Sequence, residues 1–403
     1  MGMVKGVQNN RDGGKFRVEP HWLVIGGVWL ATAVLFLYHL RTGITPDRVA
    51  FRIPFLELDV FWYGIWIVGG IFLGSVVVSR LALRQATAVF LQHVPPHLGQ
   101  QSIHTLKLPK DLIALLEKNG YHTIAELLFQ WGLDPRYLGL NREGLKRTAD
   151  QLAKVKGVQK TWLTQAPWQI WNPDHVWNGI VWCLLLAVIG ARLYHVLTPS
   201  PSMAAVGINS PLDYFRQPAQ LFNLRNGGLG IYGGIAGGAF GLWLYTRVKR
   251  IPALAWADLA AIGVALGQVF GRWGNFFNQE LYGRPTNLPW AITIEPQYRL
   301  PGFEQFSRFH PAFLYESLWS LLAFGILYTL HTRYQKHLKT GDLMALYLIL
   351  YAIGRILLET VRLDSRTMVI AGLDLNIAVA TFVSILVAIA MGIWIFYRHR
   401  IAR

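Results

Sequence analysis

The 403-residue sequence is poor in cysteine and in charged residues. Its one cysteine, Cys183, lies inside the apolar run WCLLLAVIG, so no disulfide can form within the chain. We interpret this side chain as a small buried or lipid-facing hydrophobe rather than a reactive thiol. Only 15% of the residues are charged, whereas soluble domains carry about 25%. This composition excludes disordered, collagenous and coiled-coil chains and argues against a water-soluble enzyme.

Acidic residues are the scarcer of the two charged classes. There are 22 Asp and Glu against 38 Lys and Arg, which gives a formal net charge of +16. Such an excess suits nucleic acid or anionic lipid. Because 53% of the residues are hydrophobic, anionic lipid is the nearer partner. The sequence contains no P-loop, dinucleotide fingerprint, metal motif or Ser-His-Asp order, so we expect no cofactor and no metal site.

Eight apolar runs are long enough to cross a bilayer, which takes roughly 20 mostly apolar residues. They lie at approximately 22–40, 60–83, 176–197, 228–246, 256–275, 313–331, 342–361 and 372–396. The first run has no small-residue cleavage site after it, so we expect it to stay as a membrane anchor. The sequence therefore predicts an all-α polytopic membrane protein with about eight transmembrane helices.

Basic clusters abut the ends of alternate runs, at TRVKR (246–250), HTRYQKHLK (331–339) and YRHRIAR (397–403). Because Lys and Arg are enriched on the cytoplasmic side of membrane proteins, we predict that both termini and the long segment 84–172 are cytoplasmic. The expected organisation is an N-terminal extension with its own helix (1–59), a membrane core (60–83 and 173–396), an inserted helical domain (84–172) and a basic tail (397–403).

The segment 84–172 differs from its surroundings, because its apolar residues recur at helical spacing between many polar ones. Gly120 is expected to end one helix, and Asp134-Pro135 marks a turn. Over about 45 residues this segment resembles the helix-hairpin-helix domain at the C-terminus of the bacterial RNA polymerase alpha subunit. That family uses a hairpin glycine to approach DNA phosphate, and the matching position here is Asn141, which tolerates a left-handed conformation. We expect a protein partner or a structural role, and DNA binding is disfavoured.

Ionisable side chains inside apolar runs mark functional sites by default, because burying them in lipid is costly. Tyr351, Arg355 and Glu359 are spaced i, i+4, i+8 and share one helix face, so Arg355 can pair with Glu359. The other polar candidates are Arg192; Arg272, Asn275, Asn278 and Glu280; and His310, Tyr315 and Glu316. Together with Tyr63 and Tyr232, most of these are predicted near the outer leaflet. The alternative is a structural role, with arginines reaching the interface and amides bonding between helices.

The glycine-rich stretch RNGGLGIYGGIAGG (225–238) opens one of these runs. We expect Gly230, Gly234 and Gly238 to allow close helix packing. Gly227 and Gly228 precede the helix, where free amides and the helix dipole favour an anion such as a phospholipid phosphate. Two arginines accompanied by carboxylates suit a reaction in which a phosphate leaves, because arginine binds phosphate in a bidentate manner.

Six motifs carry a resemblance to the bacterial prolipoprotein diacylglyceryl transferases. They are WYG (62–64), GARLYHVL (190–197), NGGLGIYGG (226–234), GRWGNFFNQELYGRPT (271–286), HPAFLYE (310–316) and YAIGRILLETVR (351–362). They follow the family order and cover the membrane part from about 60 to 396. The resemblance implies a seven-helix core, beside one extra N-terminal helix, in the bacterial cytoplasmic membrane, with its active site facing the outer leaflet.

The implied reaction transfers a diacylglyceryl group from phosphatidylglycerol to the lipobox cysteine thiol of a preprolipoprotein and releases glycerol 1-phosphate. Carried over by motif position, the catalytic residues are Tyr232, Arg355, Glu359, Tyr351 and Glu280. The residues expected to bind phosphatidylglycerol are Arg272, Asn275, Arg355, Tyr63, Gly283, Arg362, Gly227 and Gly228.

Tyr232 departs from the family pattern, which has a histidine at this place as the proposed base for the thiol. A tyrosine with a pKa of about 10 is a poor base near neutral pH. Either Glu359, Glu316 or His310 takes the proton, or the chain is a divergent relative that has lost catalysis. The alternative function is thus a lipid-binding membrane scaffold on the same fold. An anion transporter is disfavoured, because no inverted repeat of broken helices is visible.

Overall fold

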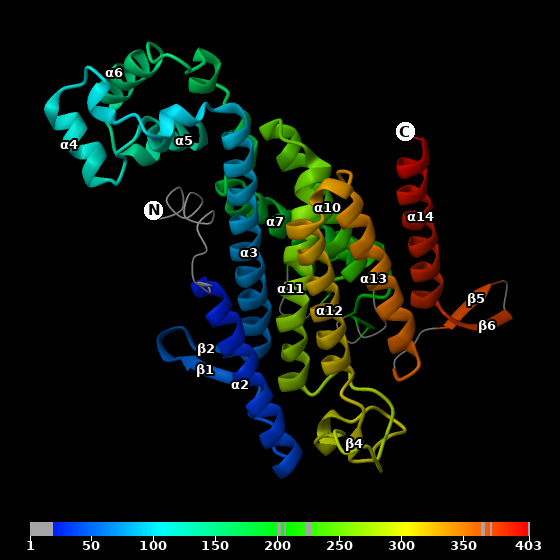
Figure 1. Ribbon diagram of the computed structural model, residues 1–403. Coiled ribbons are helices and arrows are strands. Elements are labelled where there is room, and N and C mark those ends of the chain that lie inside the picture. The colour runs from blue at the N-terminus through cyan, green and yellow to red at the C-terminus, as the bar shows by residue number, and fades with distance from the viewer. Residues whose placement is uncertain are drawn as a thin grey trace. The chain divides into compact units, whose positions relative to one another are not determined.

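The computed structural model describes residues 19–199, 203–204, 207–222, 228–363, 367–370 and 373–401. The chain divides into two compact units, of which the first holds Ser79–Ala253 and the second holds Arg17–Val78 and Leu254–Arg403. Nearly all regular structure in the described ranges is helical, which confirms the predicted all-α class (Figure 1). Helix α3 (Trp62–His93) contributes its first part to the second unit and its last part to the first.

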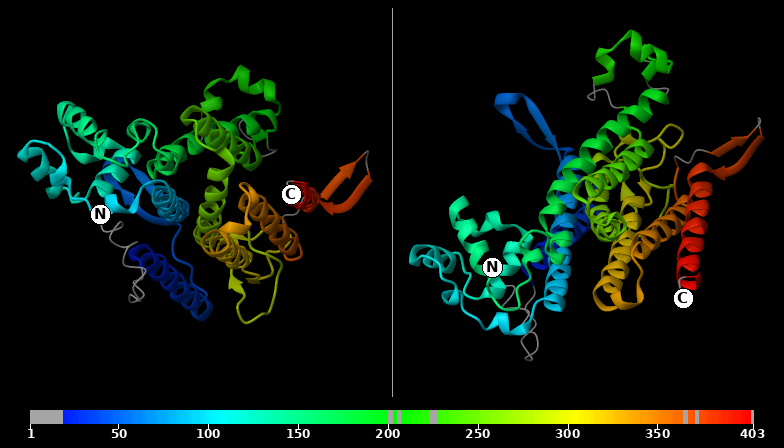
Figure 2. Two further views of the ribbon diagram at one scale, coloured as in Figure 1. Left: turned by 45° about the horizontal axis from the view of Figure 1, so that its top comes forward. Right: turned by 90° about the horizontal axis from the view of Figure 1, so that it is seen from above.

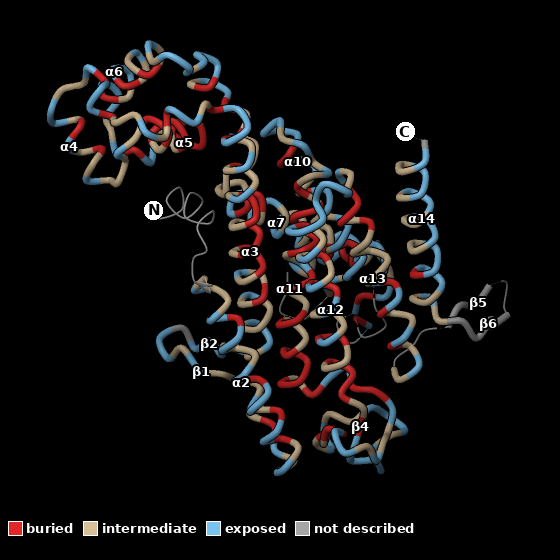
Figure 3. Tube along the Cα trace, viewed as in Figure 1, coloured by how far each residue is buried: buried red, intermediate tan, exposed pale blue. Residues whose placement is uncertain are grey.

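The inserted domain is built from the end of α3, α4 (Lys110–Lys118), α5 (Ile124–Leu133), α6 (Arg142–Leu152) and several 3-10 turns. Helix α3 continues past its predicted end because Ala86 and Phe90 are buried in the core of this domain. A capping box fixes the start of α5, since the Thr123 hydroxyl accepts from the Glu126 amide and the Glu126 carboxylate accepts from the Thr123 amide. The core is seen as the buried residues of α5 in Figure 3.

The turn between η5 (Pro135–Leu138) and α6 corrects one prediction. Asn141 has an extended conformation, φ −72° and ψ 173°, and its Oδ1 accepts a hydrogen bond of 2.7 Å from the Gly144 amide as the N-cap of α6. The left-handed residue is Gly139, with φ 74°. Asn141 was misread because asparagine favours helix N-caps as well as left-handed positions. Asn141 therefore does not take the left-handed conformation expected for it, and Gly139, two residues earlier, does.

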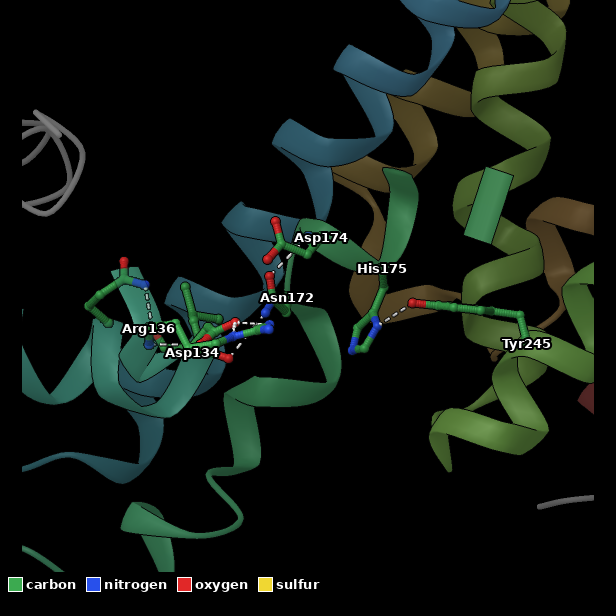
Figure 4. Close-up of polar contacts among 8 residues, drawn as sticks. Asp134, Arg136, Asn172, Asp174, His175 and Tyr245 are labelled. Carbon is green, nitrogen blue, oxygen red and sulfur yellow. Dashed lines mark hydrogen bonds and ion pairs between the residues drawn. The ribbon is translucent and has the colours of Figure 1, made fainter. Parts of the chain in front are cut away.

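Polar contacts join the inserted domain to the helix that follows it, α7 (Asp174–Leu197) (Figure 4). The Asn172 side-chain amide donates to the Leu133 carbonyl at 3.1 Å, and its Oδ1 accepts from the Asp174 amide at 2.9 Å. At the second residue of α7, His175 Nδ1 lies 2.8 Å from the Tyr245 hydroxyl on α10 (Ile231–Lys249). The domain is thus tied to the start of α7, and α7 is tied to α10.

Glycines let α7 and α10 pack at backbone distance, as the sequence predicts, but in a different register. A Cβ on Gly233 would lie 2.1 Å from the Gly190 carbonyl oxygen, and one on Gly237 would lie 2.1 Å from the Leu186 carbonyl oxygen. By contrast, a Cβ on Gly234 would make only ordinary contact. Gly230 lies at the contact as predicted, because its amide donates to the Ala191 carbonyl at 2.9 Å, but the close face continues through Gly233 and Gly237 instead of Gly234 and Gly238. The short helices α8 (Pro211–Arg216) and α9 (Ala219–Phe222) complete this unit.

The second unit contains α2 (Pro20–Thr42), the first part of α3, α11 (Ala253–Asn278), α12 (Ala312–Arg333), α13 (Asp342–Glu359) and α14 (Val379–Ile401). Helices α3 and α11 approach closely, because a Cβ on Gly74 would lie 2.4 Å from the Gly263 carbonyl oxygen. An aromatic cluster that includes Phe36, Trp273 and Phe313 joins α2, α11 and α12.

Six helices of the described ranges are long and apolar enough to cross a membrane, namely α2, α3, α7, α11, α12 and α14. The other two predicted runs are the helices α10 and α13, which are shorter and carry glycines or charged residues. Three hairpins were not predicted, and two of them are seen beside the helices in Figure 2. They pair β1 (Val49–Ile53) with β2 (Leu58–Phe61), β3 (Ile292–Thr293) with β4 (Arg308–Phe309), and β5 (Thr367–Ile370) with β6 (Leu373–Ala378). The last hairpin occupies the start of the predicted run 372–396, so α14 begins at Val379.

Candidate active site

The C-terminal end of α11 and the turn after it position three of the predicted residues, Asn275, Asn278 and Glu280. Beyond Asn278 the backbone takes positive φ values at Gln279 (51°) and Leu281 (54°), which is uncommon for residues other than glycine. The turn brings Glu280 back over the helix, where its Oε1 accepts from Asn275 Nδ2 at 2.9 Å and from Asn278 Nδ2 at 3.2 Å. Asn275 is buried and Glu280 is exposed, so this pair connects the helix interior to the surface.

Arg272, one turn earlier on α11, pairs with a carboxylate of α12. Its Nε lies 2.6 Å from Glu316 Oε2, and Arg362 Nη1 lies 3.4 Å from Glu316 Oε1. Glu316 is buried, with 8% of its surface exposed. One carboxylate therefore holds two guanidinium groups, both of which were predicted to bind phosphate.

Arg355 and Glu359 form the predicted ion pair on α13, with Arg355 Nη1 lying 2.5 Å from Glu359 Oε2. Both Glu359 oxygens are buried, yet neither receives a well-aligned hydrogen bond from the described part of the chain. Tyr351, the third predicted member of this face, is 37% exposed, and its ring centroid lies 6.3 Å from that of Tyr347. Arg355 Nη1 and both Glu359 oxygens therefore lack an aligned hydrogen-bond partner within the described chain.

Gly283 lies where three segments meet. Its amide donates to the His310 carbonyl at 2.9 Å, and it bridges Arg362 in an antiparallel contact. A Cβ at this position would lie 2.6 Å from the Val361 carbonyl oxygen and 2.9 Å from the His310 Cβ. Only glycine fits, so Gly283 lets the segment after α11 pass between His310 and the end of α13.

His310 stands before α12 in a chain of three side chains. Trp290 Nε1 donates to the Tyr315 hydroxyl at 2.9 Å, and that hydroxyl lies 3.0 Å from His310 Nδ1. Burial lowers the pKa of His310, so its imidazole is neutral near pH 7.

Tyr63 opens α3 and packs on α11, since a Cβ on Gly274 would lie 2.8 Å from the Tyr63 Cδ2. It lines a mostly apolar cavity of about 910 Å³, which also has Arg48 and Asn278 on its wall. Arg48 was not predicted from the sequence. Its Nη2 donates to the Asn278 carbonyl at 2.5 Å and its guanidinium lies 3.5 Å from the centre of the Tyr298 ring. Arg48 is a single arginine between two apolar runs and belongs to no motif, so the sequence does not mark it as a site residue.

Tyr232, Gly228 and Arg192 lie in the first unit. Arg192 Nε donates to the Leu221 carbonyl and its Nη1 to the Gly228 carbonyl, both at 2.9 Å, and its Nη2 contacts the Gln220 carbonyl. Gly228 has φ 86°, and a Cβ there would lie 2.5 Å from Arg192 Nη1. The Arg192 guanidinium therefore binds backbone carbonyls of the segments that precede α10.

The Tyr232 ring lies on the first turn of α10, with its centroid 5.9 Å from that of Tyr194. Gly227 lies outside the described residues. The predicted roles of Tyr232 and Gly227 stay predictions.

Comparison with known proteins identifies this arrangement of motifs. The family model for prolipoprotein diacylglyceryl transferase matches residues 153–398, a range that includes every motif quoted above except WYG. The phosphatidylglycerol–prolipoprotein diacylglyceryl transferase of Chloroflexus aggregans is 39% identical over 245 residues, which cover 57% of this chain and 77% of that protein. The protein of the same name from Trichormus variabilis is 38% identical over 233 residues, with the same coverage. The chain therefore belongs to the prolipoprotein diacylglyceryl transferase family.

Proposed function

We propose that this chain transfers the diacylglyceryl group of phosphatidylglycerol to the lipobox cysteine of a preprolipoprotein. The cysteine sulfur forms a bond to the glyceryl carbon, and the bond between that carbon and the phosphate oxygen breaks. The leaving group is glycerol 1-phosphate, and the thiol proton goes to a base. The observation that carries this proposal is the pair of arginine–carboxylate contacts, Arg272 with Glu316 and Arg355 with Glu359.

Arg272 and Arg355 are assigned to the lipid phosphate. Glu316 Oε2 lies 2.6 Å from the Nε of Arg272 and holds the Arg272 guanidinium in place. A guanidinium fixed in this way can bind two phosphate oxygens and keeps its charge as negative charge develops on the leaving group. Stabilising that charge is the contribution expected of positioned cations in such a site.

The other assigned residues shape the lipid site. Tyr63 and the cavity beside it suit an acyl chain, because the cavity wall is mostly apolar. Asn275 and Glu280, which are hydrogen-bonded to each other, are assigned to the glycerol hydroxyls, and Tyr351 stays a predicted catalytic residue. Arg362 contributes a second positive charge next to Glu316. Gly283 allows the segment after α11 to pass close to Val361 and His310. Gly227 and Gly228, in the first unit, stay predicted phosphatidylglycerol-binding residues.

We place the protein in the bacterial cytoplasmic membrane with this site at the outer leaflet and with the inserted domain in the cytoplasm. The basic clusters at the ends of α10 and α14 support this orientation. We also propose that the inserted domain binds a cytoplasmic protein, and we assign no particular surface to this contact.

Arg355→Lys is the experiment that tests the role of phosphate binding. Lysine keeps the positive charge near Glu359 but loses the two-pronged contact, so we expect transfer from phosphatidylglycerol to a lipobox peptide to fall at least tenfold. Arg333→Lys, at the end of α12, is the matched control and should leave the rate unchanged. Full activity of Arg355→Lys would show that bidentate recognition is not the task of this position.

A further inference from the structure

The proposed reaction needs a group that takes the thiol proton, because a cysteine with a pKa of about 8.5 is mostly protonated near neutral pH. Tyr232 stands where the family has its histidine. Among the candidate site residues of the second unit, four carry a carboxylate or imidazole that can accept a proton, namely His310, Glu280, Glu316 and Glu359. The hydrogen bonds of each decide which of them can receive one.

The hydrogen bonds of His310 disfavour it as the base. The Tyr315 oxygen accepts a hydrogen bond from Trp290 Nε1, and we assign the Tyr315 hydroxyl proton to His310 Nδ1, which lies 3.0 Å away. With Nδ1 accepting, the neutral imidazole carries its proton on Nε2. We assign this tautomer from the hydrogen-bond network. His310 is therefore arranged to donate from Nε2.

Glu316 and Glu280 are also engaged. Each Glu316 oxygen faces a guanidinium, at 2.6 Å from Arg272 and 3.4 Å from Arg362, so both oxygens already have a cationic partner. Glu280 is exposed, and two side-chain amides donate to its Oε1.

Glu359 differs from both. Its oxygens are buried and receive no hydrogen bond from the described chain, and its one charged neighbour among the ion pairs is Arg355. That neighbour is also the residue assigned to the lipid phosphate. A phosphate that binds Arg355 competes with Glu359 for the same guanidinium. The carboxylate then has no counter-charge among the ion pairs of the described chain, although both of its oxygens are buried.

We propose that Glu359 is the group that accepts the thiol proton, and that lipid binding at Arg355 prepares it to do so. This inference rests on the proposed transferase function. The proton moves from the cysteine sulfur to a Glu359 oxygen, and the sulfur electron pair forms the new bond to the glyceryl carbon. The electrons of the broken carbon–oxygen bond leave with glycerol 1-phosphate. The proton then passes from Glu359 to the released phosphate or to water, which restores the Arg355–Glu359 pair.

The test compares two nucleophiles on the purified full-length protein. One lipobox peptide carries cysteine, and the other carries selenocysteine, whose selenol is largely ionised near neutral pH and needs no base. Glu359→Gln keeps the size of the side chain and removes the proton acceptor. With the cysteine peptide we expect kcat to fall about 10²-fold or more, the range for a positioned proton-transfer group. With the selenocysteine peptide we expect most of the wild-type rate.

Glu316→Gln is the matched control, because it disturbs the arginines and leaves Glu359 intact. It should lose activity with both peptides. Glu359→Asp guards against misfolding, since it keeps a charge beside Arg355 but withdraws the carboxylate by one methylene. It should slow the cysteine reaction more than the selenocysteine reaction. Equal losses with the two peptides in both Glu359 variants would overturn the assignment. Wild-type protein that is inactive with both peptides would instead refute the transferase function itself.

Discussion

Arg272 on α11 and Glu316 on α12 form an ion pair with 2.6 Å between Nε and Oε2. The second oxygen of the same carboxylate faces Arg362. Two cations from different segments thus converge on one buried anion, and the geometry of the proposed phosphate site depends on it.

Glu316→Gln is expected to disrupt this geometry. The amide cannot balance two guanidinium groups, and removing one partner of a buried pair costs about 3 kcal/mol or more. We expect the thermal midpoint of the purified protein to fall and transfer activity to drop at least tenfold. Glu304→Gln, in an exposed loop, is the control and should change neither quantity. A Glu316→Gln protein with normal stability and rate would show that the carboxylate does not position the arginines.

Gly283→Ala should impair catalysis because the added methyl group would lie 2.6 Å from the Val361 carbonyl oxygen. Backbone must shift to admit it, and a displacement of about 1 Å near a reacting centre can cost about 10²-fold in rate. Gly325→Ala on α12 is the control, because no atom lies within 4 Å of its added Cβ. Steady-state transfer rates of the two variants separate the effects, and equal rates would contradict the close packing seen at Gly283.

Tyr232→Phe tests the departure from the family pattern. If another group takes the thiol proton, removing the hydroxyl should leave most of the activity. Tyr232→His should do no harm and should raise the rate at lower pH, where an imidazole with a pKa of about 6.5 is still a competent base. A loss of about 10²-fold in Tyr232→Phe would instead make the hydroxyl essential.

The orientation predicts which surface an impermeant thiol reagent can reach in intact cells. In a chain whose Cys183 has been replaced, a cysteine at the exposed Ser307 should be labelled, and one at the exposed Gln159 should be labelled only after the membrane is opened. The reverse pattern would place the inserted domain outside and overturn the topology.

The sequence predicted the helices and the Arg355–Glu359 pair, because both follow from periodicity along a single element. It did not predict that Arg272 and Arg362 share Glu316, since that contact depends on how separate segments pack. The glycine spacing also predicted Gly234 and Gly238 on the close face of α10, whereas the close contacts are at Gly233 and Gly237. A glycine-rich helix offers several faces of similar composition, so the sequence alone does not select one.

The three hairpins and Arg48 were missed for a related reason. Strands β1 and β2 are short and lie next to apolar runs, so their pattern is lost in the hydropathy of the neighbouring helices. The contact of Arg48 with the Tyr298 ring joins residues far apart in the chain. Only the folded structure brings such residues together.

The most direct test of the central claim is transfer by the purified chain. Phosphatidylglycerol labelled in its acyl chains is incubated with the protein and a lipobox peptide, and the peptide mass and the released glycerol phosphate are measured together. We expect one diacylglyceryl group on the cysteine sulfur for each glycerol 1-phosphate released. Lipid that binds to the protein while neither product forms, in wild type and in Tyr232→His alike, would contradict the transferase function and favour the lipid-binding scaffold.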